Sequence, residues 1–367
     1  MENSHRQTDG RDMTAPARNK PRGRGTTSTI DPRYLELQRE AVADDWYEEE
    51  APAKIKTQVT VERAKTIISR NQSPDIPFEQ SINPYRGCEH GCIYCYARPT
   101  HAYMDLSPGI DFESRLFVKE NAAELLRREL DQSGYACKPI ALGANTDPYQ
   151  PLERDRRITR SIIEVLAEYQ HPLTIVTKSR LVQRDMDLLA PMAELGLCKV
   201  FVSVTTLNVD LARRMEPRAS SPASRLETVA RLAAAGIPTG VLFAPVIPAL
   251  NDMDLEAVLD AAAAAGAESA GYIMLRLPRE IKQLFVEWLD THAPLKARHV
   301  MQLIRELRGG RENDPNFFSR HQGTGVFADL IRQRFEQACR RLGLNRRERE
   351  LNTSRFRGKR ASQLKLF

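Results

Sequence analysis

The chain has 367 residues, of which 41% are hydrophobic and 28% charged, with 19 Gly and 22 Pro. This composition excludes collagen-like, disulfide-scaffold and wholly disordered proteins, and the length allows one large domain with appendages or two ordinary domains. The longest apolar stretch, 239–250, is broken by two prolines and is too short to cross a bilayer, and the N-terminus lacks an apolar signal core. We therefore expect a cytoplasmic protein with no membrane partner.

The positive charge lies at one end of the chain. The formal net charge is +6, but residues 340–367 contain ten Lys or Arg against two Glu, which leaves the remainder slightly negative. Such a tail either neutralises the phosphates of a nucleic acid or keeps the protein soluble, and charge alone leaves both interpretations open.

The predicted organisation, in chain order, begins with a disordered or weakly helical arm over 1–50, because residues 1–33 contain hardly any large apolar side chains. A lead-in segment, 51–80, precedes the main domain, 81–292. A helical annex follows over 293–344, and a flexible basic tail over 345–367.

The main domain alternates short β-branched runs with amphipathic stretches. After a first strand near residue 82, strands are predicted at 139–143, 173–177, 200–205, 239–246 and 272–275. Helices are predicted at 120–130, 158–169, 184–195, 223–235, 255–265 and 281–289, with Gly196 and Gly236 as C-terminal caps. The annex adds helices at 295–307 and 326–342. This alternation predicts an α/β fold with a parallel sheet, either a partial barrel or a doubly wound sheet, with ligands at the carboxyl ends of the strands.

Three cysteines, Cys88, Cys92 and Cys95, lie on the loop after the first strand with the spacing Cys-x3-Cys-x2-Cys. Three thiolates on one loop are typical of an iron–sulfur cluster with one iron left free. A closed zinc site is the alternative, and it needs a fourth ligand, for which His90 and His101 are the candidates. The other three cysteines, Cys137, Cys198 and Cys339, have no partner spacing and read as small buried hydrophobes.

The cysteine spacing, with Tyr94 inside it and a six-fold strand–helix repeat behind it, resembles the radical S-adenosylmethionine (SAM) superfamily over residues 81–290. Within the superfamily the chain most resembles the spore photoproduct lyase-like group. The resemblance implies a partial (β/α)6 barrel and a [4Fe-4S] cluster with SAM on its fourth iron. It further implies an external electron donor and a 5′-deoxyadenosyl radical that takes hydrogen from a substrate, here a nucleic acid.

The resemblance also assigns roles to single residues. It places Tyr94 near the adenine and makes Tyr96 a catalytic tyrosine that passes hydrogen, although both rings could simply shield the cluster. Gly143, Asn145 and Thr146, at the end of the second strand, resemble the edge that binds methionine. Further cofactor-binding candidates are Lys178, Ser203, Thr205 and Arg225, with an ion pair as the alternative for Arg225 and a loop lysine for Lys178. Asn251 and Asp252 read as a helix cap.

One departure from spore photoproduct lyase affects the expected reaction. That enzyme has a hydrogen-donating cysteine just before the segment equivalent to 145–147, and this chain has Ala144 there. Cys137 lies seven residues earlier, at the opposite end of the predicted strand. We therefore expect a related radical reaction on another substrate.

The chain ends with Gln363, Leu364, Lys365, Leu366 and Phe367, which resembles the peptide that docks on the DNA polymerase sliding clamp. An apolar terminus folded back on the domain is the alternative. Three hypotheses follow: a radical enzyme acting on DNA, the same chemistry on RNA or a protein side chain, and a non-enzymatic iron–sulfur or zinc protein.

Overall fold

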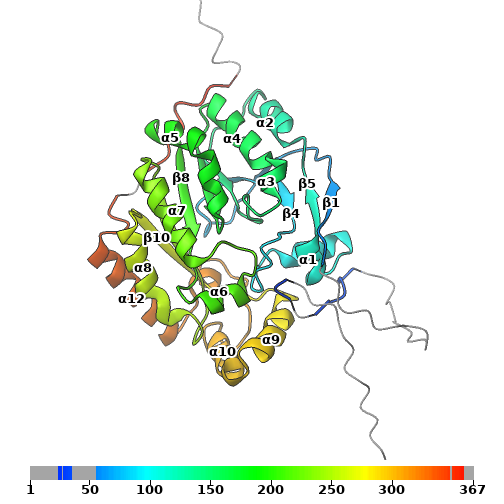
Figure 1. The fold of residues 1–367 in the computed structure, drawn as a ribbon, viewed down its shortest axis with the longest axis vertical. Helices are drawn as coiled ribbons and strands as arrows, with labels where there is room; N and C mark the ends of the chain where they lie inside the picture. The colour runs from blue at the N-terminus through cyan, green and yellow to red at the C-terminus, as the bar shows by residue number, and fades with distance from the viewer. Residues whose placement is uncertain (1–23, 27, 35–54, 348, 359–367) are drawn as a thin grey trace, which may run out of the picture.

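The computed structural model describes residues 24–26, 28–34, 55–347 and 349–358 (Figure 1). Its main sheet has the strand order β10-β9-β8-β7-β6-β3-β2, in which β2 (Ile68–Arg70) is antiparallel to β3 and the remaining neighbours are parallel. The six parallel strands are β3 (Gln80–Ile82), β6 (Ile140–Leu142), β7 (Leu173–Thr177), β8 (Cys198–Ser203), β9 (Thr239–Val246) and β10 (Ser269–Met274).

The parallel strands lie in chain order without a reversal, which excludes the doubly wound alternative. The two edges of the sheet are not paired with each other, so the predicted partial barrel is confirmed as an open one. The connecting helices surround the sheet (Figure 1). They are α2 (Ala122–Leu130), α4 (Ile158–Glu168), α5 (Met186–Glu194), α7 (Pro222–Ala234), α8 (Leu255–Ala264) and, after the last strand, α9 (Ile281–His292).

Strand β7 illustrates why these segments are strands. Leu173, Ile175 and Thr177 are buried, whereas Thr174 and Val176 between them are half-buried, because alternate side chains point to opposite faces. The helices end where glycine allows a left-handed residue: Gly196 and Gly236 have φ of 71° and 73°. These two predicted caps are therefore confirmed.

The predicted bounds of β7 and β9 match the structure, whereas β8 begins two residues earlier than expected, at Cys198. Sequence patterning did not predict the second sheet, whose order is β1-β5-β4. Its strands β1 (Gln58–Val61), β4 (Tyr85–Arg86) and β5 (Arg115–Val118) have two to four residues each, too few to show a period. The remaining short elements are η1 (Arg98–Met104), α1 (Ile110–Ser114), α3 (Glu153–Arg156), η2 (Arg180–Asp185), α6 (Val209–Met215) and η3 (Asp252–Asp254).

The helical annex consists of α10 (Pro294–Glu306), α11 (Ser319–Gln322) and α12 (Val326–Leu342). Helix α12, whose bounds match the prediction, packs against α8, and its Phe335 contacts Tyr272 of β10 with ring centroids 4.8 Å apart.

A bridge of side chains connects the two edges of the open sheet. On the β10 side, Arg308 donates to the carbonyl of Leu275 at 2.7 Å and to that of Ser319 at 2.8 Å. Next to Ser319, Arg320 makes two hydrogen bonds, of 2.6 and 2.7 Å, to the buried carboxylate of Asp75, in the β2–β3 connection. The bridge therefore joins the two edges without backbone pairing between strands.

The first half of the basic tail is not the flexible extension that its composition predicts. Residues 349–358 run from the annex back along the body (Figure 1), where the N–H of Asn352 donates to Gly196 and that of Arg357 to Tyr169. Phe356 packs against Tyr135 and His171, with ring centroids 5.4 and 5.3 Å apart. One aromatic side chain thus anchors an otherwise polar segment.

The described part of the N-terminal arm also differs from the disorder expected of residues 1–33. The backbone N–H groups of Gly25 and Thr26 donate to Glu113, and Arg33 pairs with Glu280 at 2.6 Å. Backbone contacts and single ion pairs hold this segment, so its lack of apolar side chains does not prevent docking. The predicted clamp-binding residues Gln363, Leu364, Leu366 and Phe367 lie outside the described residues. Within the described part of the chain, no helix has the length and apolar character to span a membrane.

Candidate active site at the carboxyl ends of the strands

The cysteine loop follows β3 and β4 at the carboxyl edge of the main sheet. Cys88 and Cys92 are buried, Cys95 is half-buried, and the N–H of Cys88 donates to the carbonyl of Phe112 at 2.9 Å. Gly87 has φ of 77°, and a Cβ there would lie 2.9 Å from the same carbonyl. The loop can therefore approach α1 this closely only with glycine at that position.

Arg98, which is fully buried, fixes the shape of the loop from behind. Its guanidinium donates to the carbonyls of Gly91 and Cys92 at 3.1 and 2.9 Å, and it pairs with the buried carboxylate of Glu113 at 2.5 Å. It also donates to the carbonyls at positions 108 and 109. Because each donor direction of a guanidinium is fixed, this set of bonds holds the backbone at the second cysteine in one conformation.

The environment of the three thiols fits a cationic, sulfur-binding group. Burial, then the charge of Asp147 and the other thiols, raises the pKa of Cys88 well above its usual value. Burial also raises the pKa of Cys92, to about 12, and that of Cys95. Three such thiolates on one loop need compensating positive charge, which an iron–sulfur cluster supplies.

Neither candidate for a fourth zinc ligand is directed to the thiols. His90 Nδ1 lies 3.3 Å from Asp147 Oδ2, and His101 Nε2 lies 3.0 Å from the carbonyl of Arg115. Over the described ranges, no group of three or more His, Cys, Asp or Glu side chains, the three cysteines included, is arranged around a common metal position. The residues that would hold a metal here are Cys88, Cys92 and Cys95, and three sulfur donors are what a cluster with one free iron requires.

The end of β6 reaches the same edge through Asn83. The side-chain oxygen of Asn83 accepts the N–H groups of Asn145 and Thr146 at 2.9 and 3.4 Å, and the hydroxyl of Thr146 donates to Tyr85. Gly143 has φ of 92°, and a Cβ there would lie 2.3 Å from the carbonyl of Val176. The backbone at Gly143 thus closely approaches the neighbouring strand β7.

Asp147 joins this segment to β7. Its carboxylate accepts the Thr177 hydroxyl and the Lys178 N–H, each at 2.7 Å. Burial alone would raise the pKa of Asp147, but His90 and these hydrogen bonds outweigh it and lower the pKa to about 2. Asp147 therefore holds the cysteine loop and two strand ends together.

Lys178 places its ammonium group on the inner side of the sheet, at the carboxyl ends of the strands. Its Nζ donates to Ser203 Oγ at 3.1 Å and lies 5.8 Å from the ring centroid of Tyr94. Among the described residues, no carboxylate lies within ion-pair distance of this ammonium group. Lys178, Ser203 and Tyr94, predicted separately, are thus brought together beside the cysteine loop.

A buried carboxylate, Glu216, organises the wall next to Lys178. It accepts hydrogen bonds from the hydroxyls of Tyr94 and Thr205, the latter at 3.0 Å, and pairs with Arg225. The same guanidinium donates to the carbonyl of Ser203 at 3.0 Å and to that of residue 220. Arg225 therefore forms an ion pair, which was the alternative to a SAM contact. The pair is buried and does not lie on the surface.

Tyr96 is half exposed, and its hydroxyl donates to the carbonyl of Ala144. It thus lies across the opening between the cysteine loop and β6. Cys137 lies three residues before the start of β6, whereas Ala144 lies two residues after its end. The two positions are at opposite ends of the strand, as predicted.

Sequence reasoning did not single out Asn83, Arg98 or Glu216 as site residues. It took Asn251 for a helix cap, but the buried Asn251 side chain donates to the carbonyls of Thr205 and residue 245, at 2.7 and 2.9 Å, and makes no cap bond. A polar residue directly after a strand was the available signal for Asn83, which follows Ile82. No local pattern marks Arg98 or Glu216.

Comparisons with known proteins agree with this arrangement. Residues 82–262 match a sequence model described as "Radical SAM superfamily". An uncharacterized protein of Mycobacterium tuberculosis is 39% identical over 232 residues, which cover 63% of this chain and 68% of that protein. An uncharacterized protein of Methanocaldococcus jannaschii is 29% identical over 199 residues, 54% of this chain and 71% of that protein.

Among solved structures, spore photoproduct lyase complexed with dinucleoside spore photoproduct superposes with a TM-score of 0.54. The alignment covers 78% of this chain and 80% of that one, at 15% identity. At this identity the likeness concerns the fold, and the site must be judged from its own residues.

Proposed function

This chain belongs to the radical SAM superfamily and is a radical SAM enzyme, and we propose that it directs its chemistry at a nucleic acid. When bound, a [4Fe-4S] cluster and SAM supply a carbon-centred radical that removes a hydrogen atom from a substrate. In this proposal Cys88, Cys92 and Cys95 hold the cluster.

The observation that carries the assignment of the cofactor site is the position of Lys178 relative to the cysteine loop. Its ammonium lies over Tyr94, the residue before Cys95, and has no carboxylate partner among the described residues. An uncompensated cation at a strand end attracts a carboxylate, and SAM carries one in its methionine part. We assign Lys178, with Ser203 beside it, to that carboxylate in place of Arg225, whose charge Glu216 already compensates.

The other residues position and enclose the cofactor. The segment Gly143, Asn145 and Thr146, fixed by Asn83, would accept the methionine amino group, and Thr205 and Glu216 hold Tyr94 from behind. Tyr96, half exposed at the opening, would contact the substrate. Hydrogen return by a thiol, as in spore photoproduct lyase, is not part of the proposal because Ala144 offers no S–H.

The basic C-terminal region supports a nucleic-acid target. Residues 340–367 carry a net charge of +8 on a chain that is otherwise slightly negative. Phosphates neutralised by such a segment release counterions, which contributes affinity without sequence preference. All six cysteines are free in the structure, which supports a cytoplasmic, reducing location.

The proposal is tested by anaerobic reconstitution with iron, sulfide, reductant and SAM, followed by detection of 5′-deoxyadenosine. We expect product from the natural chain, none from Cys88→Ala, and full yield from Cys137→Ala, which removes a cysteine outside the loop. A deuterium-transfer screen over damaged DNA, RNA and peptides then identifies the substrate class. Absence of 5′-deoxyadenosine from an iron-loaded protein would refute the reaction, and transfer only to peptides would refute the nucleic-acid target.

We also propose the sliding clamp as a partner for the C-terminal peptide. Gln363, Leu364, Leu366 and Phe367 supply the polar and apolar anchors of such a ligand. Retention of the full-length protein on immobilised clamp should be lost in a Gln363→Ala, Phe367→Ala variant. Equal retention of both proteins would remove the clamp from the proposal.

A further inference from the structure

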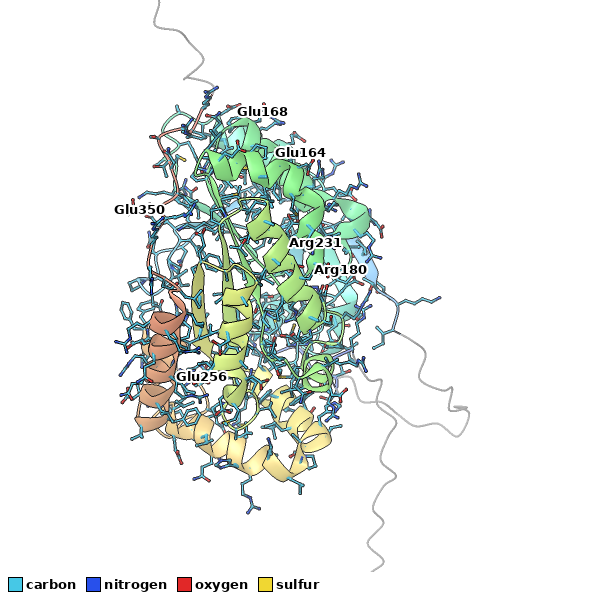
Figure 2. All side chains as sticks on the ribbon, turned by 60° about the vertical axis from the view of Figure 1, so that its left-hand side comes forward. Glu164, Glu168, Arg180, Arg231, Glu256 and Glu350 are labelled. Carbon is cyan, nitrogen blue, oxygen red and sulfur yellow. The ribbon has the colours of Figure 1, made fainter. Side chains whose placement is uncertain are left out.

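A hollow of about 580 Å³ lies beside the candidate site, bounded by η2, the start of α7 and the cysteine loop. Its lining is dominated by arginine, with no lysine and one acidic residue, Glu227. Figure 2 labels two of the arginines on the same face of the molecule, Arg231 of α7 and Arg180. We call this hollow the arginine pocket, and its arginines are Arg154, Arg180, Arg184, Arg218 and Arg231.

Three of these arginines are compensated by acidic side chains. Arg184 pairs with buried carboxylates on either side, Arg218 pairs with Glu89 at 2.8 Å, and Arg231 with Glu227 at 2.5 Å. By contrast, the guanidinium groups of Arg154 and Arg180, both exposed, have no side-chain partner among the residues that the structure describes. The pocket therefore has excess positive charge in a chain whose body is slightly negative overall.

The arginine pocket shares a wall with the candidate site. The carbonyl of Lys178 accepts the N–H of Ser220 at 3.2 Å, and the hydroxyl of Ser220 accepts the N–H of Arg180 at 2.9 Å. Lys178 directs its ammonium toward Ser203 and Tyr94 inside, whereas Arg180, two residues later, lines the pocket outside. His90 of the cysteine loop lines the pocket as well.

We propose that the arginine pocket binds consecutive phosphates of the nucleic-acid strand that carries the target, an inference that rests on the proposed function. Guanidinium groups match phosphate oxygens bidentately, and the hydroxyls of Ser179 and Ser220 in the lining add hydrogen-bond donors of the kind that contact phosphates. A concave site is suited to a projecting phosphodiester, whereas an acidic protein would present a broad face. A strand held there lies along the edge that carries the cysteine loop and Lys178.

The test measures binding of a fluorescein-labelled single-stranded DNA of about 20 nucleotides by anisotropy, in salt from about 50 to 200 mM. The full-length variant Arg154→Ala, Arg180→Ala is compared with Arg63→Ala, Arg298→Ala, which removes the same charge from two exposed arginines elsewhere. Two phosphate contacts on a single strand contribute about 1.4 to the slope of log K against log salt. We expect the pocket variant to lose about that much slope and the control variant to keep the natural value.

Formation of 5′-deoxyadenosine without DNA should be unchanged in both variants, because neither pair of side chains contacts the candidate site. Equal salt slopes for the pocket variant and the natural chain would overturn the pocket assignment while leaving the proposed function standing. Failure of the natural chain itself to bind DNA or RNA would instead overturn the nucleic-acid target. The same variants are also tested for binding to polyglutamate. If the pocket variant lost polyglutamate binding and kept DNA binding, the pocket would be a docking site for an acidic protein, and the assignment would be overturned.

Discussion

Replacing Arg98 with alanine should weaken both the fold and the retention of iron. The guanidinium is fully buried and makes five hydrogen bonds, one of them within its ion pair with Glu113. A hydrogen bond to a charged group contributes about 1.5–3 kcal/mol to the free energy of unfolding, but adding this value for all five bonds overestimates the loss of stability. Breaking a buried pair costs about 3–5 kcal/mol in practice. Glu113 keeps three backbone N–H donors from residues 24–26, so we expect the lower end of that range.

Two assays separate the two effects. Urea unfolding of the metal-free protein should show the loss of stability, and iron per chain after reconstitution should fall further than stability alone explains, because the carbonyls of Gly91 and Cys92 lose their donor. The double variant Arg98→Met, Glu113→Gln removes the stranded carboxylate and should recover part of the stability without recovering the iron. Natural stability and natural iron content in Arg98→Ala would refute the role assigned to this residue.

Three further outcomes are expected. Burial lowers the pKa of His171 from 6.5 to about 4. The neutral imidazole therefore contributes its full share to the free energy of unfolding above pH 6.5, and that free energy falls by about 3 kcal/mol as the pH drops to 4. Unfolding midpoints measured across this range should fall less steeply in His171→Gln, and parallel curves would contradict the reasoning. Phe356→Ala should cost about 1–2 kcal/mol and expose the tail to protease, whereas Leu295→Ala, at a 99% exposed residue, should cost nothing measurable. Lys178→Ala should weaken SAM binding to the reconstituted protein by about 10–100-fold in calorimetry, with partial recovery in Lys178→Arg, and unchanged affinity would exclude the carboxylate contact.

The sequence predicted those parts of the molecule whose signal is local. The periods of β7, β9 and α12 and the spacing of the three cysteines are each contained in fewer than 20 residues, and the segments lie where expected. The strands of the second sheet, such as β5, are too short to show a period.

The organisation of the site depends on contacts between distant parts of the chain. Glu216 meets Tyr94 across 122 residues, and neither position carries a local mark of that contact. The family resemblance made Arg225 a candidate ligand on the helix after the fourth strand, but its role depends on this same carboxylate. Lys178 was predicted more securely because the end of a parallel strand fixes its position without a partner.

The bridge between Asp75 and Arg320 closes the gap between the two edges of the sheet without a ladder of backbone hydrogen bonds. A fully closed barrel admits molecules only through its ends, whereas here the ring is completed by Arg308, Arg320 and the N–H of Phe318, the last two of which bind Asp75. None of these contacts belongs to a backbone ladder of the sheet, so breaking them would leave the strand pairing intact. For the nucleic-acid target proposed above, such an opening would admit a strand sideways at an internal position, with no need to thread a free end.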